Sequence, residues 1–120
     1  MIAIVDYGAG NLRSVFNAFE AIGHAAEITD DPKRLHNADA IVLPGVGAFG
    51  DGMKRLAERN MLEVLNEAVL VQKKPYLGIC LGLQYLAEES LENGQHKGFG
   101  WIKGRVIPIE PPSPNFRVPH

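Results

Sequence analysis

Short apolar runs that alternate with helical patterns constrain this chain to a sheet flanked by helices. The runs are typical of strands that are buried on both faces. They occupy residues 2–5, 40–43 and 75–77, and a weaker strand is predicted over residues 24–29. Between them, apolar residues recur at helical spacing over residues 12–22, 33–38, 53–59 and 61–72. This order predicts an α/β protein with a doubly wound, mostly parallel sheet and right-handed crossovers.

Local signals indicate where the first two helices begin. Asn11 is suited to cap the first helix, and Asp31 followed by Pro32 is suited to open the second. Within the first helix, we expect Phe16 and Phe19 to pack in the core.

The C-terminal part of the chain has a different pattern. Residues 98–109 are glycine-rich and β-rich, which favours short antiparallel strands over another strand–helix unit. Residues 111–120 are rich in proline and are expected to be irregular.

The composition is that of an ordinary globular domain. The 120 residues are 46% hydrophobic and 22% charged, with a formal net charge of −2. This balance indicates no nucleic-acid partner, and no apolar run is long enough to span a membrane. The single cysteine cannot form an internal disulfide, which favours the reducing cytoplasm. No motif indicates a metal or another cofactor.

That cysteine, Cys80, lies between two glycines at a predicted strand-to-helix turn. Gly78 and Gly82 remove the Cβ atoms that would collide in such a turn, and a helix is predicted over residues 83–89. The thiol would be exposed at the carboxyl end of the strand, where unpaired N–H groups and the helix dipole favour the thiolate. A lone cysteine is more often a buried structural residue, but the glycine pair favours a nucleophile.

A cysteine that attacks an amide or acyl carbon needs N–H donors for the oxyanion that forms. Leu81 follows the nucleophile and supplies one donor. The Val46–Gly47 peptide, in the glycine-rich loop over residues 44–52, is suited to supply the second. A phosphate-binding loop is less favoured, because no Gly-Lys-Ser/Thr follows.

The general base is not evident in the sequence. The four histidines are His24, His36, His96 and His120. None is paired with a nearby acid, and each is more typical of a surface position. Two explanations stay open: the cysteine is not catalytic, or the base belongs to a part of the protein beyond residue 120.

Four segments resemble the class I glutamine amidotransferase family. Residues 78–84 are similar to its nucleophile elbow. Residues 6–15, 43–49 and 98–101 narrow the resemblance to the glutaminase subunits of imidazole glycerol phosphate synthases. The resemblance extends along essentially the whole chain and implies a flavodoxin-like, doubly wound fold.

The resemblance also implies an activity and a set of roles. Cys80 would form a glutamyl thioester, hydrolysing glutamine to glutamate and ammonia. A (β/α)8-barrel cyclase subunit would use the ammonia in histidine biosynthesis, as the partner in a heterodimer. By position, the implied residues are Leu81, Val46 and Gly47 as oxyanion donors, Gly45 and Gln84 for glutamine binding, and Tyr7, Asn11, Arg13 and Phe49 near the partner interface.

The family carries its catalytic histidine and glutamate in a downstream His-x-Glu segment. The resemblance therefore implies that residues 1–120 are the N-terminal part of a single glutamine amidotransferase domain, roughly three-fifths of a subunit. We expect little or no glutaminase activity from this chain alone. We also expect it to associate through an exposed sheet edge or apolar face.

Three other functions are compatible with parts of the sequence. DJ-1/PfpI-like hydrolases and chaperones also use cysteine elbows and place an acid after the first strand, where this chain has Asp6. Glutaminases of other biosynthetic pathways share the elbow but differ in the segment at residues 6–15. A phospho-acceptor signalling domain would need an aspartate where Leu43 and Pro44 stand, and is the least favoured.

Overall fold

A four-stranded parallel sheet forms the centre of the molecule. The computed structural model describes residues 1–118. The strands lie in the order β2-β1-β3-β4, and every pairing in this sheet is parallel. They are β1 (Ile2–Val5), β2 (Ala26–Thr29), β3 (Ala40–Gly45) and β4 (Tyr76–Cys80). The predicted mostly parallel α/β class is confirmed.

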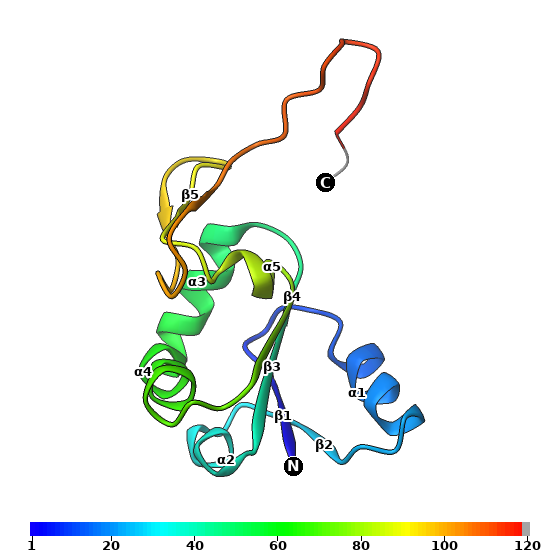
Figure 1. Cartoon of the computed structure of the whole chain (residues 1–120), viewed down its shortest axis with the longest axis vertical. Coiled ribbons are helices and arrows are strands. Elements are labelled where there is room, and N and C mark those ends of the chain that lie inside the picture. The colour runs from blue at the N-terminus through cyan, green and yellow to red at the C-terminus, as the bar shows by residue number, and fades with distance from the viewer. Residues whose placement is uncertain (119–120) are drawn as a thin grey trace.

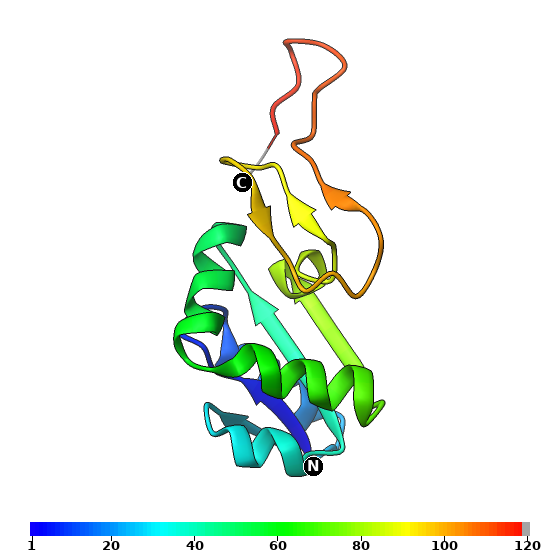
Figure 2. The ribbon, with the colours of Figure 1, turned by 90° about the vertical axis from the view of Figure 1, so that its left-hand side faces the viewer.

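Helices lie on both faces of this sheet, as a doubly wound fold requires. They are α1 (Leu12–Ala21), α2 (Pro32–Asn37), α3 (Phe49–Glu58), α4 (Met61–Asn66), the π-helical turn η1 (Glu67–Val71) and the single turn α5 (Leu81–Gln84). Figure 1 shows α2, α3 and α4 on one side and α1 alone on the other. Figure 2 looks onto the face that α2, α3 and α4 cover.

The two helix starts predicted from the sequence differ in the structure. The Asp31 carboxylate accepts the N–H of Lys33 at 2.9 Å and caps α2 as expected. Asn11 occupies the N-cap position of α1, but its side chain makes no capping hydrogen bond.

The main hydrophobic core lies between the sheet and the helices α2, α3 and α4. Alternate strand residues point into it, because successive side chains of a strand point to opposite faces. The core residues are Ala3, Val5, Ile41 and Leu43 from the strands and Leu35, Leu56, Met61 and Leu65 from the helices. All are between 0 and 1% exposed, and each fully buried leucine or isoleucine contributes about 1.5–3 kcal/mol.

The opposite face is covered only in part. Ile4 and Val42 are 0% and 2% exposed, whereas Leu77, the register partner of Val42 on β4, is 51% exposed. α1 contains no fully buried residue, and Phe16 and Phe19 are half-buried. The prediction that these two rings lie in the core is therefore wrong in degree, because α1 contacts β1 and β2 but does not extend over β4.

After α5 the chain forms a second, small sheet instead of the predicted helix over 83–89. Its strands are β5 (Glu89–Ser90), β6 (His96–Lys97) and β7 (Arg105–Val106), in the order β6-β5-β7. β5 and β6 are antiparallel, but both lie before residue 98, and β7, the strand within residues 98–109, pairs in parallel with β5. The prediction of short antiparallel strands over 98–109 is therefore wrong. Most of residues 98–109 lies outside any strand.

A competing set of hydrogen bonds explains why the helix stops early. The carbonyl of Tyr85 accepts from the N–H of Phe99 at 2.7 Å, and the carbonyl of Ala87 accepts from Gly100 at 3.0 Å. These carbonyls would bond within the helix if it continued. The incoming segment thus takes the partners that helix extension needs.

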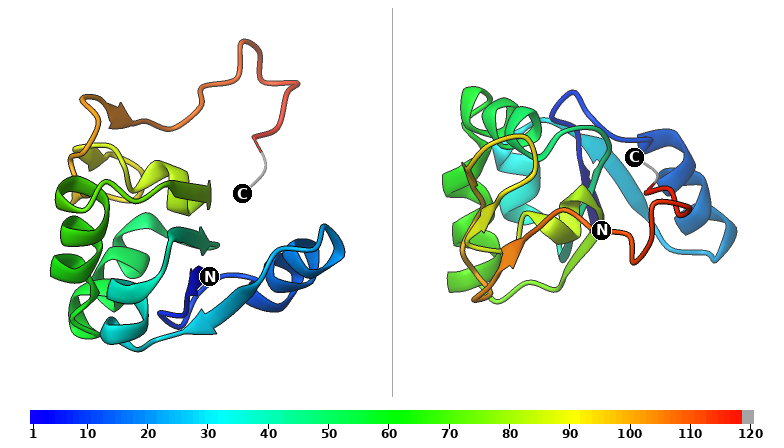
Figure 3. Two further views of the ribbon diagram at one scale, coloured as in Figure 1. Left: turned by 60° about the horizontal axis from the view of Figure 1, so that its bottom comes forward. Right: turned by 90° about the horizontal axis from the view of Figure 1, so that it is seen from above.

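Aromatic packing attaches this segment to the main core. Phe99 and Trp101 stack at 4.3 Å between ring centroids, and the Trp101 indole N–H donates to Asn66 at 2.6 Å. Beyond β7, residues 107–118 contain no helix or strand and extend away from the sheet (Figure 3). Residues 119–120, part of the predicted irregular end, lie outside the described residues.

Candidate active site

Cys80 lies at the sharp turn between β4 and α5. Its backbone has φ +58° and ψ −114°, a conformation that costs a non-glycine residue about 1–3 kcal/mol. The side chain is exposed. An exposed cysteine on a strained strand-to-helix turn is the geometry that the sequence predicted. The helix that follows is a single turn, so few peptide dipoles add up behind it.

The two flanking glycines allow main-chain segments to approach closely. A Cβ at Gly78 would lie 2.5 Å from the carbonyl of Gly82, and a Cβ at Gly82 would collide with the Leu43 carbonyl of β3. The Tyr76 hydroxyl also donates to the Gly82 carbonyl at 2.6 Å. The elbow is therefore fixed against both strands.

The glycine-containing loop after β3 lies beside this elbow. Gly45, the last residue of β3, is the register partner of Cys80. Val46 is 58% exposed, and Gly47 has φ +98° with open space where a Cβ would stand. The Val46–Gly47 peptide thus follows directly from the strand position next to Cys80.

This loop is shorter than the sequence indicated. β3 continues through Pro44 and Gly45, and α3 begins at Phe49, so only residues 46–48 lie outside regular structure. Proline is compatible with this strand position because β1 pairs only as far as Val42. Beyond that point, one side of β3 needs no N–H donor.

The other predicted site residues lie on α5. Leu81 begins the helix and is 4% exposed, and the N–H groups of a first helical turn have no partner within the helix. Gln84 is half-buried, and its Oε1 atom is buried without a hydrogen-bond partner among residues 1–118. An unpaired buried acceptor costs about 1–3 kcal/mol unless a bound molecule donates to it.

The residues predicted near a partner interface divide into two groups. Asn11 and Arg13 are exposed, and the Arg13 guanidinium lies 4.9 Å from the centroid of the Phe16 ring. Tyr7 and Phe49 are 0% and 4% exposed, so their side chains belong to the core beneath that surface.

A tyrosine that the sequence analysis did not single out, Tyr85, lies beneath the loop. Its hydroxyl is 3.1 Å from that of Tyr7, whose own hydroxyl donates to the Pro44 carbonyl at 2.8 Å. Burial raises the pKa of both phenols, so both are protonated near neutral pH. Gly52 in α3 was the available signal, because a Cβ there would collide with the Tyr85 hydroxyl.

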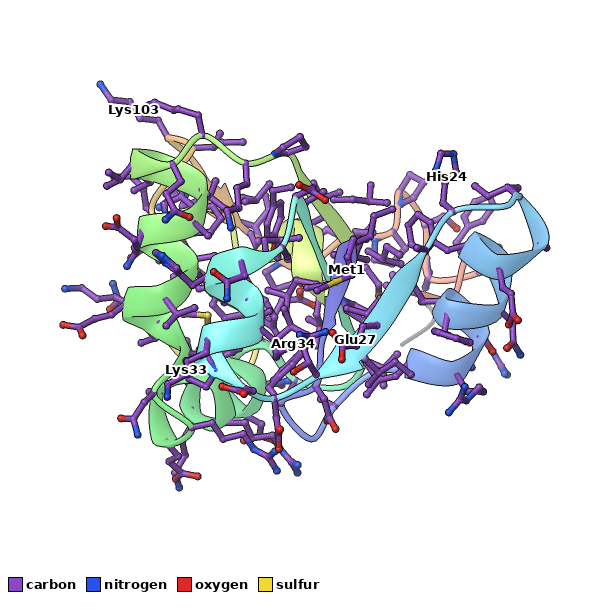
Figure 4. All side chains as sticks on the ribbon, turned by 90° about the horizontal axis from the view of Figure 1, so that it is seen from below. Met1, His24, Glu27, Lys33, Arg34 and Lys103 are labelled. Carbon is purple, nitrogen blue, oxygen red and sulfur yellow. The ribbon has the colours of Figure 1, made fainter. Side chains whose placement is uncertain are left out.

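No histidine hydrogen-bonds to Cys80 in the part of the chain that the structure describes. His24 precedes β2 and His36 lies in α2, both toward the amino ends of the strands (His24 is labelled in Figure 4). Figure 4 also shows Arg34 and Glu27, which pair at 2.7 Å near that end. His96 lies in β6, where its ring contacts the Asn93 carbonyl at 2.9 Å. His120 lies outside the described residues.

The surroundings of Asp6 bear on the DJ-1/PfpI-like alternative. The Asp6 carboxylate accepts the N–H of Gly8 at 3.2 Å within its own turn, and no hydrogen bond links it to Cys80 among residues 1–118. The same residues contain no cluster of three or more potential metal ligands. Within them, no helix has the length and apolar character needed to cross a membrane.

Comparison with known proteins agrees with this geometry. A model of the glutamine amidotransferase class-I family matches residues 3–111. The match covers most of the chain, and the chain belongs to this family.

Several relatives at about 50% identity are named as subunits of one enzyme. The imidazole glycerol phosphate synthase subunit HisH of Zymomonas mobilis is 50% identical, over 99% of this chain and 58% of the relative. Subunit HisH of Methanothermobacter thermautotrophicus is 53% identical, over 100% of this chain and 58% of the relative. Subunit HisH 1 of Campylobacter jejuni is 51% identical, over 100% of this chain and 59% of the relative. The chain thus spans less than two-thirds of the length of these relatives.

A solved crystal structure of a glutamine amidotransferase has the same fold. It superposes with a TM-score of 0.75 at 20% sequence identity, covering 89% of this chain and 56% of that chain.

Proposed function

We propose that this chain carries the nucleophile half of a glutaminase site, which releases ammonia from glutamine for imidazole glycerol phosphate synthesis. The observation that carries the proposal is the register of Gly45 with Cys80. It sets an exposed thiol beside a peptide with space to turn its N–H toward the oxygen of the reacting carbonyl group.

In the proposed reaction, the Cys80 sulfur attacks the side-chain amide carbon of glutamine. A C–S bond forms, and the carbonyl electron pair moves to oxygen as an oxyanion. The N–H groups of Leu81 and of the Val46–Gly47 peptide stabilise that charge. The C–N bond then breaks, and nitrogen takes up a proton and leaves as ammonia. Water hydrolyses the thioester to glutamate and restores the thiol.

One further residue supports glutamine as the substrate. The unpaired Gln84 Oε1 offers an acceptor to the amide or ammonium group of an amino-acid ligand. Gly45, which the resemblance also implies for glutamine binding, would offer only backbone atoms, because the buried Tyr7 hydroxyl occupies the place of a Cβ there.

The relatives are named as subunits of a synthase, which supports a partner chain that consumes the ammonia. We assign that partner as the (β/α)8-barrel cyclase of a cytoplasmic heterodimer. Asn11 and Arg13 are the exposed members of the predicted interface. Arg13→Glu should weaken association with the cyclase subunit, and Lys103→Glu, an exposed lysine between β6 and β7, should leave association unchanged.

Covalent labelling of Cys80 by a chloroketone analogue of glutamine tests the chemistry. The sulfur displaces chloride from this probe, and mass spectrometry identifies the labelled residue. Glutamine should protect the thiol and asparagine should not, and Cys80→Ala should take up no label. Labelling that glutamine does not slow, combined with rapid oxidation of Cys80 by peroxide, would favour a DJ-1/PfpI-like thiol protein instead.

The loop glycine provides a matched pair of variants. Gly47 and Gly94 have nearly the same φ, +98° and +99°, but Gly94 lies in the turn between β5 and β6. Both alanine variants should lose about 1–2 kcal/mol of stability, because alanine is strained at positive φ. Only Gly47→Ala should slow labelling by the glutamine analogue, and equal slowing in Gly94→Ala would count against the oxyanion role.

A steady-state glutaminase assay tests whether the chain turns over glutamine without a histidine beside Cys80. Because no histidine pairs with Cys80 among residues 1–118, the chain alone should release little glutamate. Rapid glutamate release by the purified chain would contradict this expectation. A glutaminase of another pathway would show the same labelling but no binding to the cyclase subunit.

A further inference from the structure

Two buried tyrosines hold the end of β3 immediately before the loop. The Tyr7 hydroxyl donates to the Pro44 carbonyl at 2.8 Å. Tyr7 has one hydroxyl proton and donates it to that carbonyl. Tyr85 is therefore the donor in the 3.1 Å hydrogen bond between the two hydroxyls. Both side chains are fully buried, and two successive hydrogen bonds connect Tyr85, the residue after α5, to the strand that carries Gly45.

The surrounding backbone leaves room for these hydroxyls and for nothing larger. A Cβ at Gly45 would collide with the Tyr7 hydroxyl, and a Cβ at Gly52 would collide with the Tyr85 hydroxyl. The Tyr85 ring also contacts Phe49 edge-on, at 5.2 Å between centroids, at the start of α3. The phenols are thus enclosed by both ends of the loop that they underlie.

The segment that carries Tyr7 is itself fixed. The N–H of Asp6 donates to the Thr29 carbonyl at 2.9 Å, and the Arg55 guanidinium donates to the Gly8 carbonyl at 2.8 Å. Tyr7 can hold the Pro44 carbonyl in place only if its own backbone is held, and these hydrogen bonds on either side of Tyr7 hold it.

A sharp boundary follows on the other side of Gly45. Gly45 is buried and paired with Cys80, whereas Val46 is 58% exposed and Gly47 has open space around it. The two tyrosine hydrogen bonds therefore end at the Pro44 carbonyl, and the exposed loop begins just beyond Gly45, at Val46.

We propose that Tyr7 and Tyr85 are positioning residues that fix the pivot of the oxyanion peptide through the Pro44 carbonyl. When the Pro44–Gly45 peptide is held in place, rotation is confined to the Val46–Gly47 peptide. The N–H of that peptide then takes up the same position beside Cys80 each time it rotates. The proposal rests on the proposed glutaminase function for its consequence, but the anchoring itself is a property of this chain alone.

Amide relaxation by NMR tests the anchoring without any ligand. In Tyr7→Phe, the order parameter of the Gly45 amide should fall from the rigid range, about 0.85, toward about 0.6. Tyr85→Phe should have a smaller effect, because the bond from Tyr7 to Pro44 is retained. Tyr76→Phe is the matched control, since it loses a phenol hydrogen bond to the Gly82 carbonyl instead. An unchanged Gly45 amide in Tyr7→Phe, or an equal loss in Tyr76→Phe, would overturn the proposal.

Labelling kinetics then test the consequence for the site. Tyr7→Phe should slow the reaction of Cys80 with the chloroketone analogue of glutamine about tenfold, the effect of one lost hydrogen bond. Its reaction with iodoacetamide, which needs no oriented oxyanion donor, should be unchanged. If Gly45 loosens but glutamine protects no labelled thiol in the wild-type chain, the glutaminase function fails and the anchoring stands. If glutamine protects the wild-type thiol and Tyr7→Phe reacts at the wild-type rate, the positioning role fails and the glutaminase function stands.

Discussion

The two faces of the central sheet are covered to very different degrees. On the α2–α3–α4 face the strand side chains are sealed, and the core from Ala3 to Leu65 is essentially inaccessible to water. On the α1 face, burial falls across one register row from 0% exposed at Ile4 to 51% at Leu77. The first face holds most of the fully buried side chains, and the second leaves Leu77 and Ile79 partly in water.

The largest difference should appear in a pair of leucine truncations. Leu56→Ala on the sealed face should lower the free energy of unfolding by about 2–5 kcal/mol, because it leaves a cavity. Leu77→Ala on the open face should lower it by less than about 1 kcal/mol, because that side chain is already half in water. Urea unfolding of both variants measures the difference, and similar losses would mean that β4 is covered in solution.

The open face should also govern self-association. Leu77 and Ile79 lie two residues apart on β4, so they share a face, and they are 51% and 37% exposed. Replacing both with lysine should weaken association about tenfold or more. Ile109→Lys, at a 74% exposed residue beyond β7, is the control and should have no such effect. Sedimentation velocity over a concentration series measures this, and a wild-type chain that stays monomeric throughout would rule the contact out.

An alkaline titration should probe the sealed face specifically. All three tyrosines of the chain have a pKa raised by burial: Tyr7, Tyr76 and Tyr85. A raised pKa stabilises the fold fully below the unfolded value near pH 10, and that stability is lost as the pH rises through the folded value. Each tyrosine should therefore add up to about 1.4 kcal/mol of destabilisation per pH unit above about pH 10.

Ultraviolet absorbance of tyrosinate follows this titration. It should appear in one step together with the loss of circular dichroism, and Tyr7→Phe should make the alkaline loss of stability less steep. A phenol that titrates near pH 10 in the folded chain would contradict the burial of that tyrosine.

The smallest effect should come from the two helix caps. Asp31→Ala should cost about 1 kcal/mol, because it removes the bond to the N–H of Lys33 at the start of α2. Asn11→Ala should cost only a few tenths, because Asn11 makes no side-chain capping bond to α1. Thermal unfolding distinguishes the two, and equal losses would mean that the α1 cap forms in solution.

The parallel sheet was predictable because its strands combine apolar runs with clear turn signals. The run at residues 2–5 has the bounds of β1, and Asp31 caps α2 as expected. The elbow glycines around Cys80 were also predictable, since their spacing reports a close approach of two backbones.

The errors arose where distant residues override local preference. Gly50 and Gly52 favoured a loop, but they lie inside α3 because the His96 ring and the Tyr85 hydroxyl fill the space beside them. The helix predicted over 83–89 ends at Gln84 because residues 98–100 bond to its carbonyls. Neither contact changes the periodicity of the sequence, and the glycine at position 52 was the one signal of the close approach of Tyr85.

The backbone of Cys80 has a consequence for how this molecule would respond to substitution. At φ +58° and ψ −114° a glycine would rest without strain, so Cys80→Gly should yield a chain at least as stable as the wild type. Packing therefore gives no reason for a sulfur at this position. The fold therefore does not require the residue that is proposed as the nucleophile.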